Sequence, residues 1–186
     1  ITGPKSHGWW ALNTLMVVIG MIGFMAVFAY LYLYGINPEV WSAPPPLGET
    51  AIIVGIEAAA LLAAWGGRRF LASKEGQLAE DLPWMLEALA ATLLVGALYL
   101  DVTGWLATGL EPTANGMGAT VFMLSVLQGQ VVVVAVIMAT YLAFREARGI
   151  MTTPTNVTMD IVARFIMFCA LQGMVFTFLP RVFPGV

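Results

Sequence analysis

Five long apolar stretches, separated by short polar connections, constrain this chain more than any other feature. A helix needs about 20 predominantly apolar residues to cross the hydrocarbon core of a bilayer. Hydrophobic residues make up 60% of the 186 residues and charged residues only 10%, unlike a water-soluble domain. The sequence therefore predicts an all-α, polytopic transmembrane bundle that forms a single domain over residues 1–186. Its five helices are expected at about residues 9–34, 50–66, 84–106, 118–144 and 158–179.

The Lys and Arg residues fall almost entirely in alternate connections. The connections at 35–49 and 107–117 contain none, and Arg181 follows the fifth predicted helix. Because cytoplasmic connections carry an excess of Lys and Arg, an N-in, C-out orientation is expected. The residues that define the cytoplasmic side are Lys5 before the first stretch, Arg68, Arg69 and Lys74 after the second, and Arg145 and Arg148 after the fourth.

Composition narrows the kinds of chemistry that this chain can perform by itself. A net charge of −3 provides no basic face, so nucleic acid is not an expected partner. His7 is the single histidine and Cys169 the single cysteine. A bis-histidine haem, a copper centre, a zinc site or an iron–sulfur cluster needs more such ligands. We therefore expect the chain to bind no haem or metal on its own.

Two carboxylates inside the predicted spans are candidate proton or lipid sites. An ionisable group within a bilayer is costly unless it is paired, protonated or hydrated. Glu57 lies near the middle of the second span without a basic residue one turn away. It is therefore expected to be protonated, bonded to another helix or facing a wet cavity. Asp101 lies in the outer third of the third span, where solvation at the interface or a hydrogen bond is the alternative.

Other polar residues in the spans are assigned to interfaces or to structural contacts. Gln128 and Gln130 lie in the middle of the fourth span, and their amides predict a buried, hydrogen-bonded contact with another helix or subunit. Asp160 and Arg164 are spaced i, i+4 near the start of the fifth span, a spacing that predicts an ion pair. Glu87 lies one turn inside the third span and is expected to extend toward the interface.

Three segments resemble subunit III of the haem-copper oxidases. In the segment 115–129, Asn115-Gly116 matches the family's Asp-Gly turn, residues 118–122 its Gly-Ser-Thr-Phe-Phe stretch, and Gln128-Gly129 its His-Gly step. Residues 96–105 are similar to the family's preceding helix, with Asp101 near its Gln and Trp105 on its aromatic residue. Residues 160–165 resemble the Asp-Val-Val-Trp segment that opens the last helix. The five-helix count is similar to the short members of this family.

The resemblance implies a non-catalytic subunit of a cytochrome c or quinol oxidase. Such a subunit stabilises subunit I, contacts subunit II and membrane phospholipids, and supports proton uptake, while haem and copper lie in its partner. The chain departs from the family at the histidines of the fourth helix, where Gln128 and Val131 stand, and in residues 21–34, which contain no acidic residue. A proton antenna built on those imidazoles is therefore absent.

Two other functions remain open from the sequence. The first is a subunit III-like accessory protein of a nitric-oxide reductase, which would serve a different catalytic partner with the same fold. The second is a small membrane transporter or channel lined by Glu57, Asp101 and Gln128. Transporter folds usually show internal repeats and broken helices, and the sequence shows neither pattern.

Overall fold

The computed structural model describes residues 7–72, 82–149 and 157–183, and these residues are helical without any strand. All five long helices are long and apolar enough to cross a membrane, which confirms the predicted fold class. They follow one another as α1 (His7–Ile36), the short 3-10 helix η1 (Pro38–Val40), α2 (Leu47–Ala72), α3 (Leu82–Ala107), α4 (Gly116–Ala147) and α5 (Val157–Val182).

Each helix extends slightly beyond its predicted apolar stretch. The largest difference is in α2, which ends at Ala72 rather than at residue 66, so Arg68 and Arg69 belong to the helix and not to a connection. A helix needs no apolar side chains once it reaches the interface, and the basic residue in its last turn complements the helix dipole. Lys5 and Lys74 lie outside the described residues.

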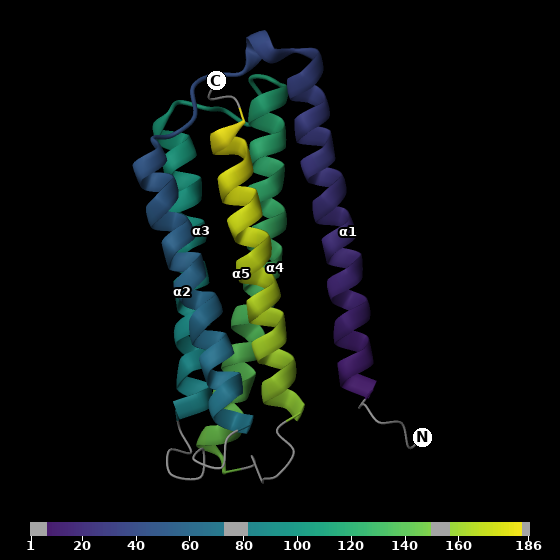
Figure 1. The fold of residues 1–186 in the computed structure, drawn as a ribbon, viewed down its shortest axis with the longest axis vertical. Helices are drawn as coiled ribbons and strands as arrows, with labels where there is room; N and C mark the ends of the chain where they lie inside the picture. Colours follow the sequence, from purple (N-terminus) through teal and green to yellow (C-terminus); the bar gives the residue numbers. More distant parts are fainter. Residues whose placement is uncertain (1–6, 73–81, 150–156, 184–186) are drawn as a thin grey trace.

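The five helices run roughly side by side, and α5 lies within the bundle while α1 lies at its edge (Figure 1). Half of the apolar 18-residue stretch of α5 is buried inside the bundle, compared with 17% of the corresponding stretch of α1. We call the end that carries the C-terminus, η1 and the α3–α4 connection the C-terminal end. The opposite end, where α1 begins, is the N-terminal end.

The half of the bundle toward the N-terminal end contains an apolar core. Small side chains allow α2 and α3 to approach each other closely there, because Ala60, Ala64 and Ala90 are fully buried. This core is completed by Leu12, Ala91, Leu94, Val131, Val132, Ala135, Ala139, Leu142, Met159, Val162, Phe165, Ile166, Cys169 and Ala170.

A hydrogen-bonded aromatic cluster joins α1 to α5 at the C-terminal end. The hydroxyl of Tyr30, which is fully buried, donates to the carbonyl of Phe183 over 2.9 Å. Trp41 donates through its indole N–H to the Tyr30 oxygen over 3.0 Å. Buried aromatic N–H and O–H groups require such partners. The segment after α1 and the end of α5 are therefore held together.

Candidate functional site

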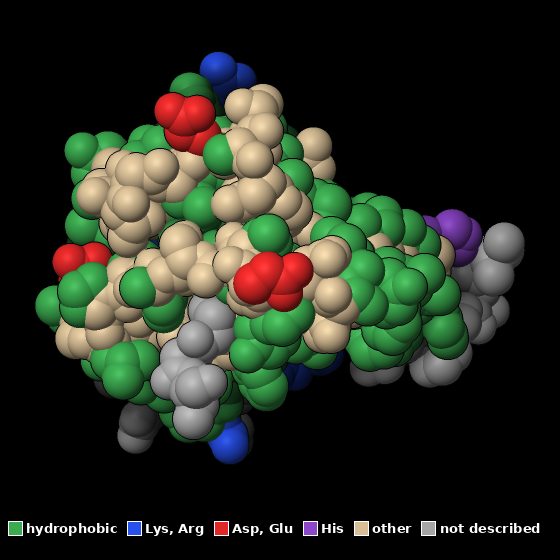
Figure 2. Space-filling view, turned by 90° about the horizontal axis from the view of Figure 1, so that it is seen from above, with side chains coloured by type: hydrophobic (Ala, Val, Ile, Leu, Met, Phe, Trp, Pro, Cys, Tyr) green, Lys and Arg blue, Asp and Glu red, His purple; other side chains and the backbone are tan. Residues whose placement is uncertain are grey.

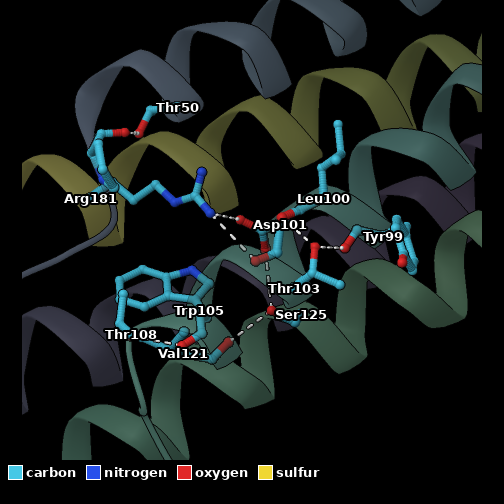
Figure 3. Close-up of polar contacts among 11 residues, drawn as sticks. Thr50, Tyr99, Leu100, Asp101, Thr103, Trp105, Thr108, Val121, Ser125 and Arg181 are labelled. Carbon is cyan, nitrogen blue, oxygen red and sulfur yellow. Dashed lines mark hydrogen bonds and ion pairs between the residues drawn. The ribbon is translucent and has the colours of Figure 1, made fainter.

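An ion pair between Arg181 and Asp101 lies inside the bundle near the C-terminal end (Figure 3). The Arg181 Nη2 atom in the last turn of α5 lies 3.0 Å from Oδ1 of Asp101 in α3. Only 1% of Arg181 and 8% of Asp101 is exposed. The expectation that Arg181 follows the fifth helix is wrong, because α5 continues to Val182 and Asp101 provides a buried counter-charge for the guanidinium.

Two neighbours of Asp101 on α3 shape the space that the guanidinium occupies. A Cβ atom on Gly104 would lie 3.1 Å from Arg181 Nη2 and 3.3 Å from Glu49 Oε2, so a side chain here would meet both groups at closer than usual contact. Trp105 is buried, and its ring centroid lies 5.5 Å from Arg181 Cζ, within the range of a cation–π contact. Glu49, an exposed residue in the first turn of α2, is thus a second acid beside Arg181.

The cluster extends from Asp101 to α4 through Ser125. The Ser125 hydroxyl lies 3.3 Å from Asp101 Oδ2 and 3.2 Å from the carbonyl of Val121, so it has an acceptor on each helix (Figure 3). Ser125 is buried. Asp101 therefore connects α3 to α4 as well as to α5.

Glu57 lies deeper in the bundle and belongs to the same cluster. Only 3% of it is exposed, its carboxylate accepts a hydrogen bond from the Thr177 hydroxyl, and Asp101 and Arg181 are close enough to act on it electrostatically. A Cβ on Gly173 of α5 would overlap Glu57 Oε1. The absence of a side chain at Gly173 therefore makes room for the carboxylate.

Two amides continue the cluster toward the middle of the bundle. Gln128 is buried, and its side-chain N–H donates to the carbonyl of Cys169 over 3.0 Å. The Gln172 side chain donates to Gln128 Oε1 over 3.4 Å. These bonds link α4 to α5 within the membrane-spanning region, where lipid offers no alternative partners.

The charges in this enclosed cluster do not balance if every group is ionised. Glu57 and Asp101 would carry two negative charges, and Arg181 carries one positive charge that it cannot lose. Two ionised carboxylates beside one guanidinium leave a net negative charge in a low-dielectric region, which is costly. The arrangement is therefore suited to holding a proton. Among the described residues, no three His, Cys, Asp or Glu side chains are grouped to hold a metal ion.

The structure brings three of the sequence-predicted residues together and separates the others from them. Glu57, Asp101 and Gln128 all belong to the cluster. Gln130 does not: it is exposed on this chain, so of the two expected contacts the structure shows the one that Gln128 makes with another helix, and a contact of Gln130 with another subunit stays a prediction. Residues two positions apart in a helix point about 200° apart, so one of the two must face outward.

Sequence reasoning missed several members of the cluster because each one looks ordinary in the sequence. Arg181 lies close to the end of an apolar stretch, where a solvated residue is normal, and hydroxyl-bearing side chains are common in membrane helices. The sequence did contain one indication of this face of α5. Gly173, Thr177 and Arg181 are spaced four residues apart, which places them on the same side of a helix. The missed residues are Glu49, Ser125, Thr177 and Arg181.

Asp160 and Arg164 form the predicted i, i+4 ion pair near the N-terminal end, far along α5 from the cluster. The Arg164 Nε atom lies 2.7 Å from Asp160 Oδ2. Arg68 of α2 also binds this carboxylate, with its Nε 2.6 Å from Oδ1. Asp160 therefore joins α2 to α5 between two arginines, and Arg68 is the partner that the sequence did not reveal.

Glu87 corrects another expectation. It does not extend to the interface but is fully buried between α3 and α2, and neither carboxylate oxygen has a hydrogen-bond partner among the described residues. A Cβ on Gly67 would lie 2.9 Å from Glu87 Oε1, so the carboxyl group packs directly against the α2 backbone. The close approach of the two helices encloses the side chain before it reaches the surface.

No protein-family model matches this chain, and no curated protein sequence matches it. We therefore infer function from the residues and from their geometry.

Proposed function

We propose that this chain is a non-catalytic subunit III of a haem-copper terminal oxidase, of the cytochrome c or quinol type, in aerobic respiration. It packs against subunit I, contacts subunit II and phospholipids, and supports proton uptake by the complex. Haem and copper belong to its partner subunits. The single observation that carries this proposal is that two of the family-like segments meet in the buried cluster, where Ser125 contacts Asp101.

Local structure at the start of α4 supports the motif on which the resemblance depends. Asn115 occupies the N-cap position, and its side-chain oxygen accepts a hydrogen bond from the Gly118 N–H over 2.8 Å. A Cβ on Gly118 would overlap the carbonyl of Glu111. The backbone at the start of α4 therefore requires both the side-chain cap of Asn115 and the absence of a side chain at Gly118, as expected for a structural motif.

The distribution of charges supports an N-in, C-out orientation in a bacterial inner membrane. The C-terminal end exposes acidic side chains (Figure 2), and Glu39, Glu49 and Glu111 are exposed there. The described arginines other than Arg181 lie toward the N-terminal end, at positions 68, 69, 145, 148 and 164. Basic residues favour the cytoplasmic side of the membrane.

The peripheral position of α1 supports a role within a larger assembly. Its exposed apolar side chains form a surface that needs lipid or another transmembrane protein, and they include Trp10, Val17, Val18, Met21, Ile22, Phe24, Met25 and Phe28. Gln130 on α4 is exposed and lines a groove between α1, α4 and α5 together with Gln172. In contact with lipid this amide would lack hydrogen-bond partners, so a partner subunit is its better environment.

Gentle detergent extraction through a tag on this chain tests the proposal. We expect haem-bearing subunits to co-purify and the preparation to consume O₂ with a quinol or cytochrome c as electron donor. Haem with nitric-oxide reduction in place of O₂ consumption would assign the chain to a nitric-oxide reductase instead. A haem-free five-helix protein would contradict both and favour transport.

A further inference from the structure

Most buried polar side chains lie in the half of the bundle toward the C-terminal end, together with two smaller apolar clusters around Trp105 and Phe176, and the buried Glu87 in the other half is the exception. The apolar core lies in the half toward the N-terminal end. The buried cluster of Glu57, Asp101, Ser125, Gln128, Thr177 and Arg181 lies in the half toward the C-terminal end. Glu57 is at the boundary, one helical turn from Ala60 on α2. The deepest carboxylate of the cluster thus has polar neighbours on one side only.

Glu87 does not continue the cluster toward the N-terminal end. Its neighbour Gly67 is ten residues beyond Glu57 on α2, a distance of about 15 Å along a helix. The buried Ala60 and Ala64 lie between them on α2, and Ala90 and Leu94 lie between Glu87 and Asp101 on α3. Within the described parts of α2 and α3, these buried side chains between Glu57 and Glu87 are therefore apolar.

Several atoms of the cluster require hydrogen-bond partners that the described residues do not provide. These atoms are Glu57 Oε2, Arg181 Nε and Arg181 Nη1. Unpaired polar atoms at such depth are costly, and a polar site with several converging groups is the kind of interior site that water occupies. The side chains that face Glu57 from the neighbouring helices are Asp101 of α3, Gln128 of α4, and Thr177 and Arg181 of α5.

A groove opens on the surface of the bundle beside this cluster, near the C-terminal end, and most of its lining is apolar. It has a volume of about 380 Å³ and lies between α2 and α3, where its lining includes Glu49, Thr103 and Gly104. Arg181 Nη2 and Glu49 Oε2 lie 3.1 and 3.3 Å from the position that a Cβ on Gly104 would occupy. Two residues of the groove lining, Glu49 and Gly104, therefore lie next to the buried guanidinium.

We infer that the cluster is an internal hydration site that opens at the C-terminal end, and that Glu57 exchanges its proton with water on that side. The ligands of this site are water molecules and a proton. They enter along Glu49 and Arg181 and reach Glu57 past Asp101 and Thr177, while the apolar core closes the opposite side. This inference rests on the geometry of the chain and does not depend on the proposed oxidase assembly.

Thiol accessibility in sealed membrane vesicles tests this direction of access. The native thiol is removed with C169A, and single thiols are then introduced with T177C or S125C in the polar half. Silver ion, a thiol reagent close to water in size, is added to one side of right-side-out or inverted vesicles. Residual free thiol is then counted by mass spectrometry after denaturation. T113C and R148C, at exposed positions of opposite ends, identify the side to which each end faces.

Matched controls come from the apolar half, where A64C and A90C occupy positions that are equally buried. We expect T177C and S125C to react at least about tenfold faster from the C-terminal side than from the other side, because only a hydrated thiol ionises to the reactive thiolate. A64C and A90C should be unreactive from both sides. Adding G104A should slow the reaction of T177C, whereas G96A should not, because nothing lies within 4 Å of a Cβ on Gly96.

Three results would overturn the inference. Unreactive thiols at both polar positions would exclude the hydration site. Faster reaction from the N-terminal side would reverse the direction of access. Equal reaction of A64C and T177C would show that water reaches both halves. S125C only replaces the hydroxyl oxygen of Ser125 with sulfur. It therefore remains informative if T177C fails to fold.

Discussion

Arg181 and Asp101 lie 80 residues apart in the sequence and form a buried ion pair, in which Nη2 lies 3.0 Å from Oδ1. This pair joins the last turn of α5 to the middle of the C-terminal half of α3, and Ser125 extends it to α4. Charged groups that pair inside a membrane protein fix the relative positions of their helices, because separation would leave each charge uncompensated. The Arg181 guanidinium and its neighbours thus fix the relative positions of α3, α4 and α5.

Breaking this pair from the acidic side should destabilise the chain strongly. In D101N the buried guanidinium keeps its charge but loses its nearest acid, and only Glu57 and Glu49 remain beside it, so the free energy of unfolding should fall by up to about 3–5 kcal/mol. Titration from a mild detergent into SDS micelles, followed by tryptophan fluorescence, measures this change. The double variant D101N/R181M should recover part of the loss because no charge is stranded. A double variant less stable than D101N would show that the pair is not the relevant interaction.

Filling the gap at Gly104 should also destabilise the chain. G104A places a methyl group 3.1 Å from Arg181 Nη2, so the guanidinium that binds Asp101 must shift by a small amount, and the cost should lie at or below the low end of the about 1–3 kcal/mol that overpacking takes. Gly96 on the same helix is the matched control, because a Cβ there meets nothing within 4 Å. G96A should be neutral or stabilising by up to about 1 kcal/mol, since alanine is the better helix former. Equal losses in both variants would argue against the packing role of Gly104.

The two glutamines of α4 should respond differently to the same substitution. Q128L removes the hydrogen bonds to the Cys169 carbonyl and to Gln172, and should cost about 0.5–2 kcal/mol. Q130L changes an exposed side chain and should leave the unfolding free energy of the isolated chain unchanged. The same SDS titration measures both. In the complex, Q130L should weaken retention of the subunit if the exposed amide bonds to a partner.

Arg68 and Arg164 both bind Asp160, so each should be able to neutralise its charge when the other is removed. Either R164A or R68A leaves the carboxylate with one partner, so each should cost less than about 1 kcal/mol at these partly exposed positions. R68A/R164A should cost more than the sum of the single changes, because it strands the Asp160 charge, and adding D160N should restore part of the loss. Strict additivity in this series would exclude the shared contact.

Glu57 should affect proton handling without holding the complex together. If it serves the proposed complex as a proton site, E57Q should slow turnover or accelerate turnover-dependent inactivation while the subunit remains bound. E39Q, which changes an exposed acid at the C-terminal end, is the control. Oxygen consumption over repeated turnovers, together with the subunit ratio on a denaturing gel, measures both effects. Unchanged turnover and lifetime in E57Q would remove this role.

The number and positions of the helices could be predicted because the bilayer imposes a minimum apolar length on each span. The Asp160–Arg164 pair could be predicted because both residues lie on one helix, where spacing determines proximity. The contacts of Arg68 and Arg181 could not, since they join helices and depend on how those helices pack side by side. Glu57, Asp101 and Gln128 were each recognisable as unusual residues within a span. Their meeting in one cluster depends on the same lateral packing.

If this chain belongs to a haem-bearing respiratory complex, as we propose, haem will stay with it through purification, so the haem content of the purified complex is the decisive measurement. We would extract tagged chain from membranes with a mild detergent, record the reduced-minus-oxidised haem spectrum, and determine the ratio of haem to chain. The proposal predicts a fixed haem ratio that persists through a second purification step and accompanies O₂ reduction. A preparation of the intact five-helix chain without haem would contradict it.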